Sequence, residues 1–276
     1  MISKKFFPLF SILFVFVACS ENKDVSQDYK VSTSKTQPYQ TTIDTGRVEV
    51  TLSNGKEKQI SFCRYAYFKL NDSSFVYEEK VNKKIIEELS YYFDEKERAK
   101  LSPKLNVGFF KEILRLYKEM YEENKFDDIL WGVDEYFDID NSYKEFVYLT
   151  RAAYDYSGGA HGNYLNNNYL FSKETGEQLF LADVINDFSK FKVLAEKNFR
   201  IQNEIPPKVS LEDYGFWFEK GFEPSQNFYF SEKGMEFVYN PYEIGPYALG
   251  QVTFTIPKKD ILPFLKINIE RTKQRT

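Results

Sequence analysis

The order of the apolar patterns along the chain constrains its fold more than any other feature. Extended runs and helical stripes occur in blocks: two strands, two helices, three strands, one helix and three short strands. Blocks of this kind favour an α+β fold, here antiparallel sheets packed with about three helices, over the strict alternation of a parallel α/β sheet. No period of 20–50 residues repeats, so the pattern excludes a solenoid.

The first block has the pattern of a β-hairpin. Val48, Val50 and Leu52 alternate with polar residues, the turn sequence Ser-Asn-Gly follows at 53–55, and extended character resumes at 58–70. Asn-Gly readily adopts the positive φ angles of a tight hairpin turn. Further strands are expected at 136–139, 146–156, 164–171, 227–231, 235–239 and 251–256.

Apolar residues at helical spacing predict three helices. Their stripes are Val81, Ile85, Leu89 and Phe93; Phe110, Ile113, Leu114, Tyr117 and Met120 or Tyr121; and Val184, Phe188, Phe191, Ala195 and Phe199. Asp183 is the expected N-cap of the third helix, and Pro206 and Pro207 end it. We interpret all three stripes as core.

The first 19 residues have the layout of an export signal. Lys4 and Lys5 precede an apolar run at 6–17, and Ala18 precedes Cys19. The run is shorter than the roughly 20 residues that cross a bilayer. Cleavage before a cysteine resembles a bacterial lipoprotein signal, so we expect residues 1–18 to be removed and Cys19 to carry the lipid, including palmitate. The body would then lie outside the cytoplasm, anchored to a bacterial membrane.

The segment after Cys19 is polar and has few aliphatic residues, so residues 19–45 are expected to form a flexible tether. We expect an N-terminal α+β domain at 46–172 and a C-terminal α+β domain at 173–268. Aromatic residues make up 18% of the chain, which predicts a substantial core. Loss of the signal with its two lysines changes the formal charge from −4 to −6. That charge argues against a nucleic-acid partner and favours a cationic one.

One segment combines three glycines with the only histidine of the chain. Residues 157–162 read Ser-Gly-Gly-Ala-His-Gly. His161 could serve as a general base with Asp155 and Ser157, but these side chains would have to lie within mutual hydrogen-bond reach. No Gly-x-Ser-x-Gly elbow surrounds Ser157. We therefore favour a structural or binding loop, whose candidate binding residues are Tyr156, Gly158, Gly159, His161 and Gly162.

No metal or cofactor is expected. An EF-hand loop starting at Asp138 would need Gly and Glu where the chain has Tyr143 and Leu149, so we interpret the acidic stretch at 122–140 as a solvated face. With Cys19 lipidated, Cys63 is a lone thiol in a strand-forming run, expected to be buried and inert. The paired carboxylates of a glycosidase have no fixed spacing in sequence, so a cell-wall glycan hydrolase stays open as the alternative.

Residues 240–250 predict a rigid, irregular loop. Their sequence, Asn-Pro-Tyr-Glu-Ile-Gly-Pro-Tyr-Ala-Leu-Gly, contains two prolines and two glycines. Tyr242 and Tyr247 have amphipathic rings that suit a binding surface. The other interpretation is that both rings close the edge of a sheet.

Together these segments resemble a known envelope module. In order they are residues 157–162, the Thr-Gly turn at 175–176 with Leu179, the helix after Asp183, and residues 240–248 before the strand at 254–257. The sequence over about 46–265 is similar to a pair of adjacent domains of unknown function. These domains occur in the extracytoplasmic part of lysozyme-sensing anti-sigma factors of the RsiV type, in the accessory region of some peptidoglycan deacetylases, and in free-standing bacterial lipoproteins.

The resemblance implies an α+β envelope module that binds a lysozyme-like protein or cell-wall glycan such as peptidoglycan. The chain shows neither the sigma-binding region and membrane helix of the anti-sigma factors nor the catalytic domain of the deacetylases. The expectation is therefore a non-catalytic binding module, with the hydrolase as its alternative.

Overall fold

The computed structural model describes residues 41–124 and 129–272. The expected signal at 1–18, the lipid-attachment residue Cys19 and most of the expected tether lie outside the described residues. Strand β1 begins at Ile43, ahead of the start expected at 46. Within the described ranges, no helix is long and apolar enough to cross a membrane.

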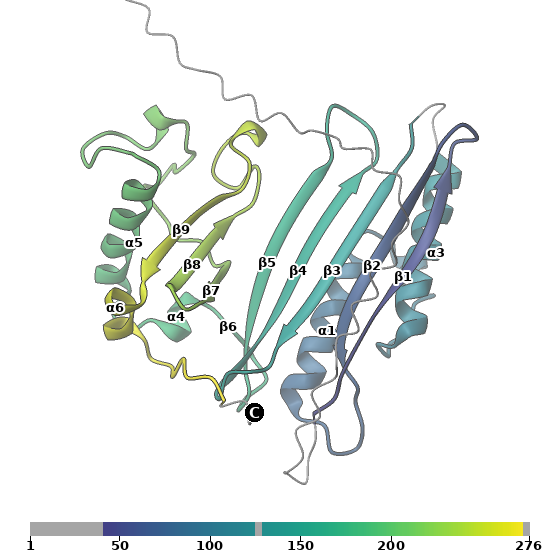
Figure 1. Ribbon diagram of the computed structural model, residues 1–276, viewed down its shortest axis with the longest axis horizontal. Helices are drawn as coiled ribbons and strands as arrows, with labels where there is room; N and C mark the ends of the chain where they lie inside the picture. The colour runs from purple at the N-terminus through teal and green to yellow at the C-terminus, as the bar shows by residue number, and fades with distance from the viewer. Residues whose placement is uncertain (1–40, 125–128, 273–276) are drawn as a thin grey trace, which may run out of the picture. The chain divides into compact units, whose positions relative to one another are not determined.

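A six-stranded sheet is the larger of the two sheets in the described residues (Figure 1). Its strands, in spatial order, are β1 (Ile43–Ser53), β2 (Lys58–Phe68), β3 (Gly132–Asp140), β4 (Phe146–Tyr156), β5 (Asn163–Ser172) and β6 (Gln178–Leu179). The α+β expectation is confirmed. One pair departs from the antiparallel pattern, because β2 and β3 run parallel. The chain passes through helices between these strands, and such a crossover allows the second strand to run in the same direction as the first.

Two long helices cover one face of this sheet. The helices of this part are α1 (Val76–Ser90), α2 (Glu95–Arg98) and α3 (Val107–Asn124). The stripes expected for the first two helices are buried, except for the half-buried Met120. Cys63 is buried in the same core, as expected. Burial raises the pKa of its thiol, and the Glu135 carboxylate adds to this effect.

A three-stranded sheet and one long helix form a second hydrophobic cluster. The elements are α4 (Leu181–Val184), α5 (Phe188–Gln202), β7 (Phe228–Phe230), β8 (Gly234–Tyr239), β9 (Val252–Pro257) and α6 (Lys258–Ile261), with short 3-10 turns at Glu212–Tyr214, Tyr247–Leu249 and Leu262–Phe264. The N-cap prediction is wrong for α5, because Asp187 accepts from the backbone of Lys190 at its start. The Asp183 carboxylate instead accepts a hydrogen bond from Phe180 N and caps the N-terminus of the short α4.

Asparagine side chains join the edge of β5 to the second sheet. Asn240 Oδ1 accepts from Asn166 N at 2.8 Å, and Asn227 Oδ1 accepts from Asn168 N at 2.9 Å. Asn227 Nδ2 also donates to the carbonyl of Asn166. These amides replace the backbone partners that a further strand would supply, so polar groups at this edge stay satisfied. We call these contacts of Asn166, Asn168, Asn227 and Asn240 the asparagine seam. It also holds Asn240, the first residue of the loop at 240–250, against β5.

Candidate functional site

The loop between β4 and β5 depends on its glycines. Gly158 and Gly159 have φ angles of +112° and +96°, a region that residues with a side chain rarely adopt. Tyr156 donates from its hydroxyl to the carbonyl of Gly159 at 3.1 Å and closes the turn. The loop leaves the His161 ring exposed at its far end.

The second loop, residues 240–250, follows β8 and holds a strained tyrosine. Tyr242 has φ +71°, one of two non-glycine residues with positive φ in the described parts of the chain. A tyrosine in this region costs of order 1–3 kcal/mol, which the surrounding structure must offset. Its ring is 53% exposed, so burial of the ring does not supply that compensation. Strain of this kind is a reason to look for function.

The two loops meet, a juxtaposition that the sequence leaves open. The rings of His161 and Tyr247 stack with centroids 3.5 Å apart and an interplanar angle of 12°. Tyr242 Oη lies 3.5 Å from His161 Nε2, and Tyr247 Oη donates to the carbonyl of Gly162 at 2.8 Å. The structure therefore brings His161, Tyr242 and Tyr247 into one cluster. Tyr156 does not join it and instead stabilises the turn between β4 and β5.

Two tyrosines of the sheet, Tyr154 and Tyr164, support this cluster. A Cβ on Gly162 would lie within 2.5 Å of ring atoms of Tyr154, so only glycine allows this close approach. Tyr164 accepts a hydrogen bond from Gln251 N at 3.1 Å and meets the Tyr247 ring edge-on at 6.0 Å. Desolvation raises the pKa of Tyr247, and its tyrosine neighbours add to the shift. The Tyr247 hydroxyl therefore stays protonated and remains a donor.

Sequence reasoning missed an exposed tryptophan on a segment whose backbone bonds to the second loop. Trp217 donates from its backbone N–H to the carbonyl of Ile244 at 2.8 Å, and its side chain is 53% exposed. The flanking Phe216 and Phe218 are buried. The signal in the sequence that would have found it is the run of three aromatic residues, Phe-Trp-Phe, at 216–218. We call His161, Trp217, Tyr242 and Tyr247 the loop cluster.

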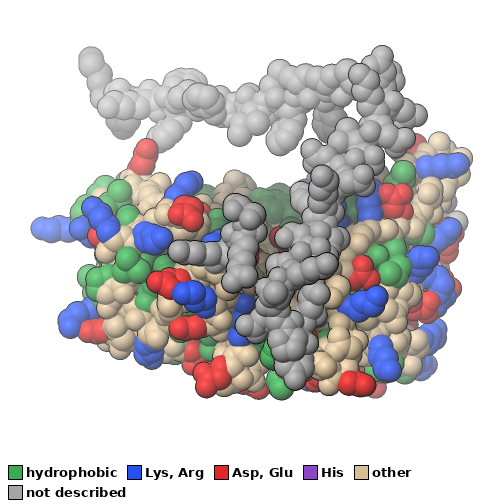
Figure 2. Space-filling view, turned by 60° about the horizontal axis from the view of Figure 1, so that its bottom comes forward, with side chains coloured by type: hydrophobic (Ala, Val, Ile, Leu, Met, Phe, Trp, Pro, Cys, Tyr) green, Lys and Arg blue, Asp and Glu red, His purple; other side chains and the backbone are tan. Residues whose placement is uncertain are grey.

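The segments that carry the loop cluster are acidic. Their exposed charged residues are Glu212, Asp213, Glu219 and Glu243 against Lys220. On the face shown in Figure 2, by contrast, basic and acidic side chains are intermixed. A local excess of carboxylates around exposed rings suits a cationic ligand.

The surroundings of His161 do not form a catalytic triad. The contacts of its ring are the Gly162 carbonyl, the Tyr242 hydroxyl and the stacked Tyr247. Neither Asp155 nor Ser157 hydrogen-bonds to it among the described residues. Burial raises the pKa of Asp155, while Asn163 and Arg151 act in the opposite direction. In the described ranges, no group of three His, Cys, Asp or Glu side chains is placed to hold a metal ion.

A second polar group of the molecule is buried under α1. Arg151 donates to both carboxylate oxygens of Glu135, at 2.9 and 2.7 Å, and also to Glu88 at 2.7 Å and Tyr92 at 2.9 Å. Glu135 is only 2% exposed, so the solvated face expected for the acidic stretch is wrong at this residue. The alternation of β3 turns Glu135 toward the helices, where Arg151 of β4 meets it. Because each charge is paired, we assign this network to structure.

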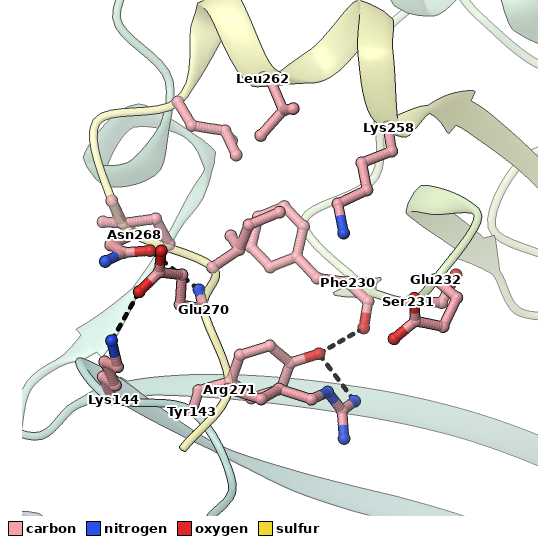
Figure 3. A pocket seen from close by; sticks show the side chains of 13 residues that line it. Tyr143, Lys144, Phe230, Ser231, Glu232, Lys258, Leu262, Asn268, Glu270 and Arg271 are labelled. Atoms are coloured by element: carbon pink, nitrogen blue, oxygen red, sulfur yellow. Dashed lines mark hydrogen bonds and ion pairs between the residues drawn. The ribbon is translucent and has the colours of Figure 1, made fainter. Parts of the chain in front are cut away.

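A pocket of about 730 Å³ lies apart from the loop cluster, at the opposite end of β8. Figure 3 shows Lys258, Leu262 and Phe230 around it, with the C-terminal segment along one side. Its walls are joined by an ion pair between Lys144 and Glu270 at 2.6 Å. Arg271 donates to Tyr143 Oη at 2.9 Å, and that hydroxyl donates to the Phe230 carbonyl at 2.8 Å. These bonds tie the C-terminal segment to the β3–β4 turn.

One part of the chain matches the model of a known protein family. Residues 169–259 match the model of a family described as "Protein of unknown function (DUF3298)". No curated protein sequence matches the chain significantly. The match confirms a domain of unknown function within the expected span, and the anti-sigma, deacetylase and lipoprotein contexts remain predictions.

Two solved structures show the same fold. A DUF3298 family member from Bacteroides fragilis NCTC 9343 is similar with a TM-score of 0.63 and 21% identity, over 83% of this chain and 94% of that chain. A DUF3298 family protein from Pseudomonas aeruginosa PAO1 is similar with a TM-score of 0.56 and 15% identity, over 85% of this chain and 99% of that chain. At these identities, the likeness shows the fold alone.

Proposed function

We propose that this chain, which carries a DUF3298 domain, is a non-catalytic lipoprotein of the bacterial cell envelope that binds a lysozyme-like protein through its loop cluster. In this proposal, residues 1–18 are removed as a signal and Cys19 carries the lipid. The tether then presents the body outside the cytoplasm. Cell-wall glycan is the alternative ligand of the same loops.

The observation that carries the proposal is the junction of exposed rings from two loops, with the backbone of Trp217 bonded to the second loop. Trp217 and Tyr242 are each more than half exposed, and the His161–Tyr247 stack holds the two main loops together. Trp and Tyr dominate the binding energy of protein interfaces, because they bring a large contact area at a small entropy cost. A stacked, hydrogen-bonded base under the exposed rings reduces the ordering cost of binding further.

Charge supports a cationic protein as the ligand. The exposed carboxylates beside the loop cluster outnumber the single lysine of those segments. Lysozyme is cationic, so these carboxylates would speed its encounter with the loops and would lose influence as salt rises.

The test is a titration of lysozyme into the full chain and into single variants. Tyr242→Ala and Trp217→Ala should each weaken binding about 30-fold, the effect of a hot-spot residue worth about 2 kcal/mol. Tyr91→Ala is the matched control, because Tyr91 is 79% exposed at the end of α1 and belongs to neither loop. That variant should bind like the wild type.

Four results would decide against the proposal. The first is that the wild-type chain binds no lysozyme at either low or moderate salt, and the second is that Tyr91→Ala weakens binding as much as Tyr242→Ala. Release of sugars from peptidoglycan by the wild-type chain, lost in His161→Ala, would instead support the hydrolase. Binding of peptidoglycan that is lost in Trp217→Ala, with no binding of lysozyme, would reassign the loops to glycan.

The envelope location has its own test. Metabolic labelling with a palmitate analogue should label the wild-type chain and should fail for Cys19→Ser. An unlabelled wild-type chain recovered from the cytosol would contradict the lipoprotein assignment and leave the binding measurement unaffected.

A further inference from the structure

The face of the six-stranded sheet that points away from α1 and α3 has a ring on each of four neighbouring strands. Tyr136, Tyr154 and Tyr164 are 38%, 43% and 37% exposed, and Phe62 is half-buried. In the register of the sheet, Phe62 pairs with Asp134, Asp134 with Tyr154, and Tyr154 with Tyr164. Paired residues share a face, so these side chains form one row across the strands, with Tyr136 two positions along β3. We call this surface the open face.

Two guanidinium groups, which can donate hydrogen bonds, lie over rings of this row. The guanidinium of Arg47 lies 4.0 Å from the centroid of the Phe62 ring, and that of Arg64 lies 5.6 Å from that of Tyr136. One carboxylate oxygen of Asp134 and the amide oxygen of Asn166 are buried and have no hydrogen-bond partner within the described part of the chain. Such unused acceptors are uncommon in native proteins, and a ligand that donates hydrogen bonds is one explanation for them.

The charges of the open face favour one class of polymer. Arg47, Lys58 and Arg64 are balanced by Glu49, Asp134 and Asp138, which occupy the same face. Single-stranded nucleic acid also stacks on aromatic rings, but it requires a positively charged groove along its phosphates. A sugar ring offers an apolar face for an aromatic side chain and hydroxyl groups for the polar ones, and it requires no net positive charge.

We propose that the open face binds a polysaccharide chain whose sugar rings stack on the aromatic row and whose hydroxyls bond to Asp134 and Arg64. At about 4.8 Å between strands, a row over four strands spans about 14 Å, enough for more than one sugar unit. In the cell envelope that polymer would be the cell-wall glycan. This inference rests on the proposed envelope location. Tyr154 and Tyr164 also support the loop cluster, so the test uses Tyr136, which lies outside that cluster.

The test compares binding of the full chain to insoluble peptidoglycan and to chitin, a neutral glycan without peptides. Tyr136→Ala should weaken binding to both by about three- to tenfold, the loss expected for one ring contact. Tyr136→Phe keeps the ring and should retain most of the affinity. Tyr91→Ala is again the control, since Tyr91 does not belong to the open face and should leave binding unchanged.

Lysozyme binding separates this site from the loop cluster. Trp217→Ala should lose lysozyme and keep glycan, and Tyr136→Ala should do the reverse, which also shows that the variant is folded. The inference is overturned if the wild-type chain binds neither glycan, or if Tyr136→Ala and wild type bind them equally. A loss of lysozyme with unchanged glycan binding in Tyr136→Ala would assign the open face to protein contact instead.

Discussion

Asp134 and Glu135 are adjacent in β3, yet they lie on opposite faces of the sheet and have very different surroundings. Glu135 points under α1, where Arg151 binds both of its oxygens. Asp134 lies on the open face, and one of its oxygens has no partner among the described residues. Burial raises the pKa of both carboxyls. Arg151 opposes this shift at Glu135, whereas Arg47 and the backbone of Phe62 oppose it at Asp134. On the covered face Glu135 and Arg151 are paired with each other, whereas the open face leaves one acceptor of Asp134 unpaired within the described ranges.

The largest effect should come from the covered face. Arg151→Met leaves Glu135 buried without its partner, which should lower the free energy of unfolding by about 3–5 kcal/mol. Arg64→Met, on the open face, should change it by less than about 0.5 kcal/mol. Urea denaturation measures both, and Arg151→Met with Glu135→Leu should recover much of the loss. Equal destabilisation by the Arg151 and Arg64 variants would show that the two faces do not differ in how much their charged groups stabilise the fold.

The asparagine seam should have the next largest effect. Asn240→Ala removes the acceptor of Asn166 N and releases the start of the second loop. A buried donor without a partner should cost about 2 kcal/mol. Asn240→Asp keeps an acceptor at this place and should cost less. Lysozyme affinity should fall in the alanine variant as well, because Tyr242 is no longer held in position by Asn240. Unchanged affinity would show that the loop at 240–250 keeps its conformation without the asparagine seam.

The glycine loop should show a smaller loss that depends on position. In Gly162→Ala the new methyl group collides with the Tyr154 ring, at a cost of about 1–3 kcal/mol. Gly159→Ala has open space around it and faces only the strain of its positive φ, about 1 kcal/mol. Thermal unfolding would rank the two variants. A larger loss in Gly159→Ala would mean that contact with Tyr154 does not decide the loop conformation.

The smallest effect should be a gain in stability on the open face. The folded chain holds the Asp134 proton more tightly than the unfolded chain does, so ionisation of Asp134 disfavours folding. Stability should therefore fall as pH rises from the unfolded pKa through the raised folded one. Since Asp134 is partly exposed, solvent screening keeps the effect below about 1 kcal/mol. Asp134→Asn should remove this pH dependence, stabilise slightly at pH 7 and weaken glycan binding; a destabilised variant would contradict the account.

Local patterns in the sequence predict most of the secondary structure. Alternation and turn residues place the hairpin, the strand at Phe146–Tyr156 is as expected, and the stripes of the long helices are buried largely as expected. The start of α5 is missed, because Asp183 and Asp187 are both good N-caps and only the intervening bend decides between them.

Such local patterns do not predict which distant segments contact each other. The Glu135–Arg151 ion pair depends on the register of β3 with β4, and the sequence pattern alone suggests a solvated carboxylate. The stack of His161 on Tyr247 depends likewise on the asparagine seam that sets one loop beside the other. Sequence therefore identifies the residues of the candidate site, and tertiary structure shows which of them meet.

Hydrogen–deuterium exchange of the full chain with and without lysozyme tests the central claim most directly. The account predicts slower exchange on binding in residues 157–162, 212–217 and 240–250, with α1 and α3 unchanged. Protection confined to the helices, or none in these three loops under saturating lysozyme, would contradict recognition by the loop cluster.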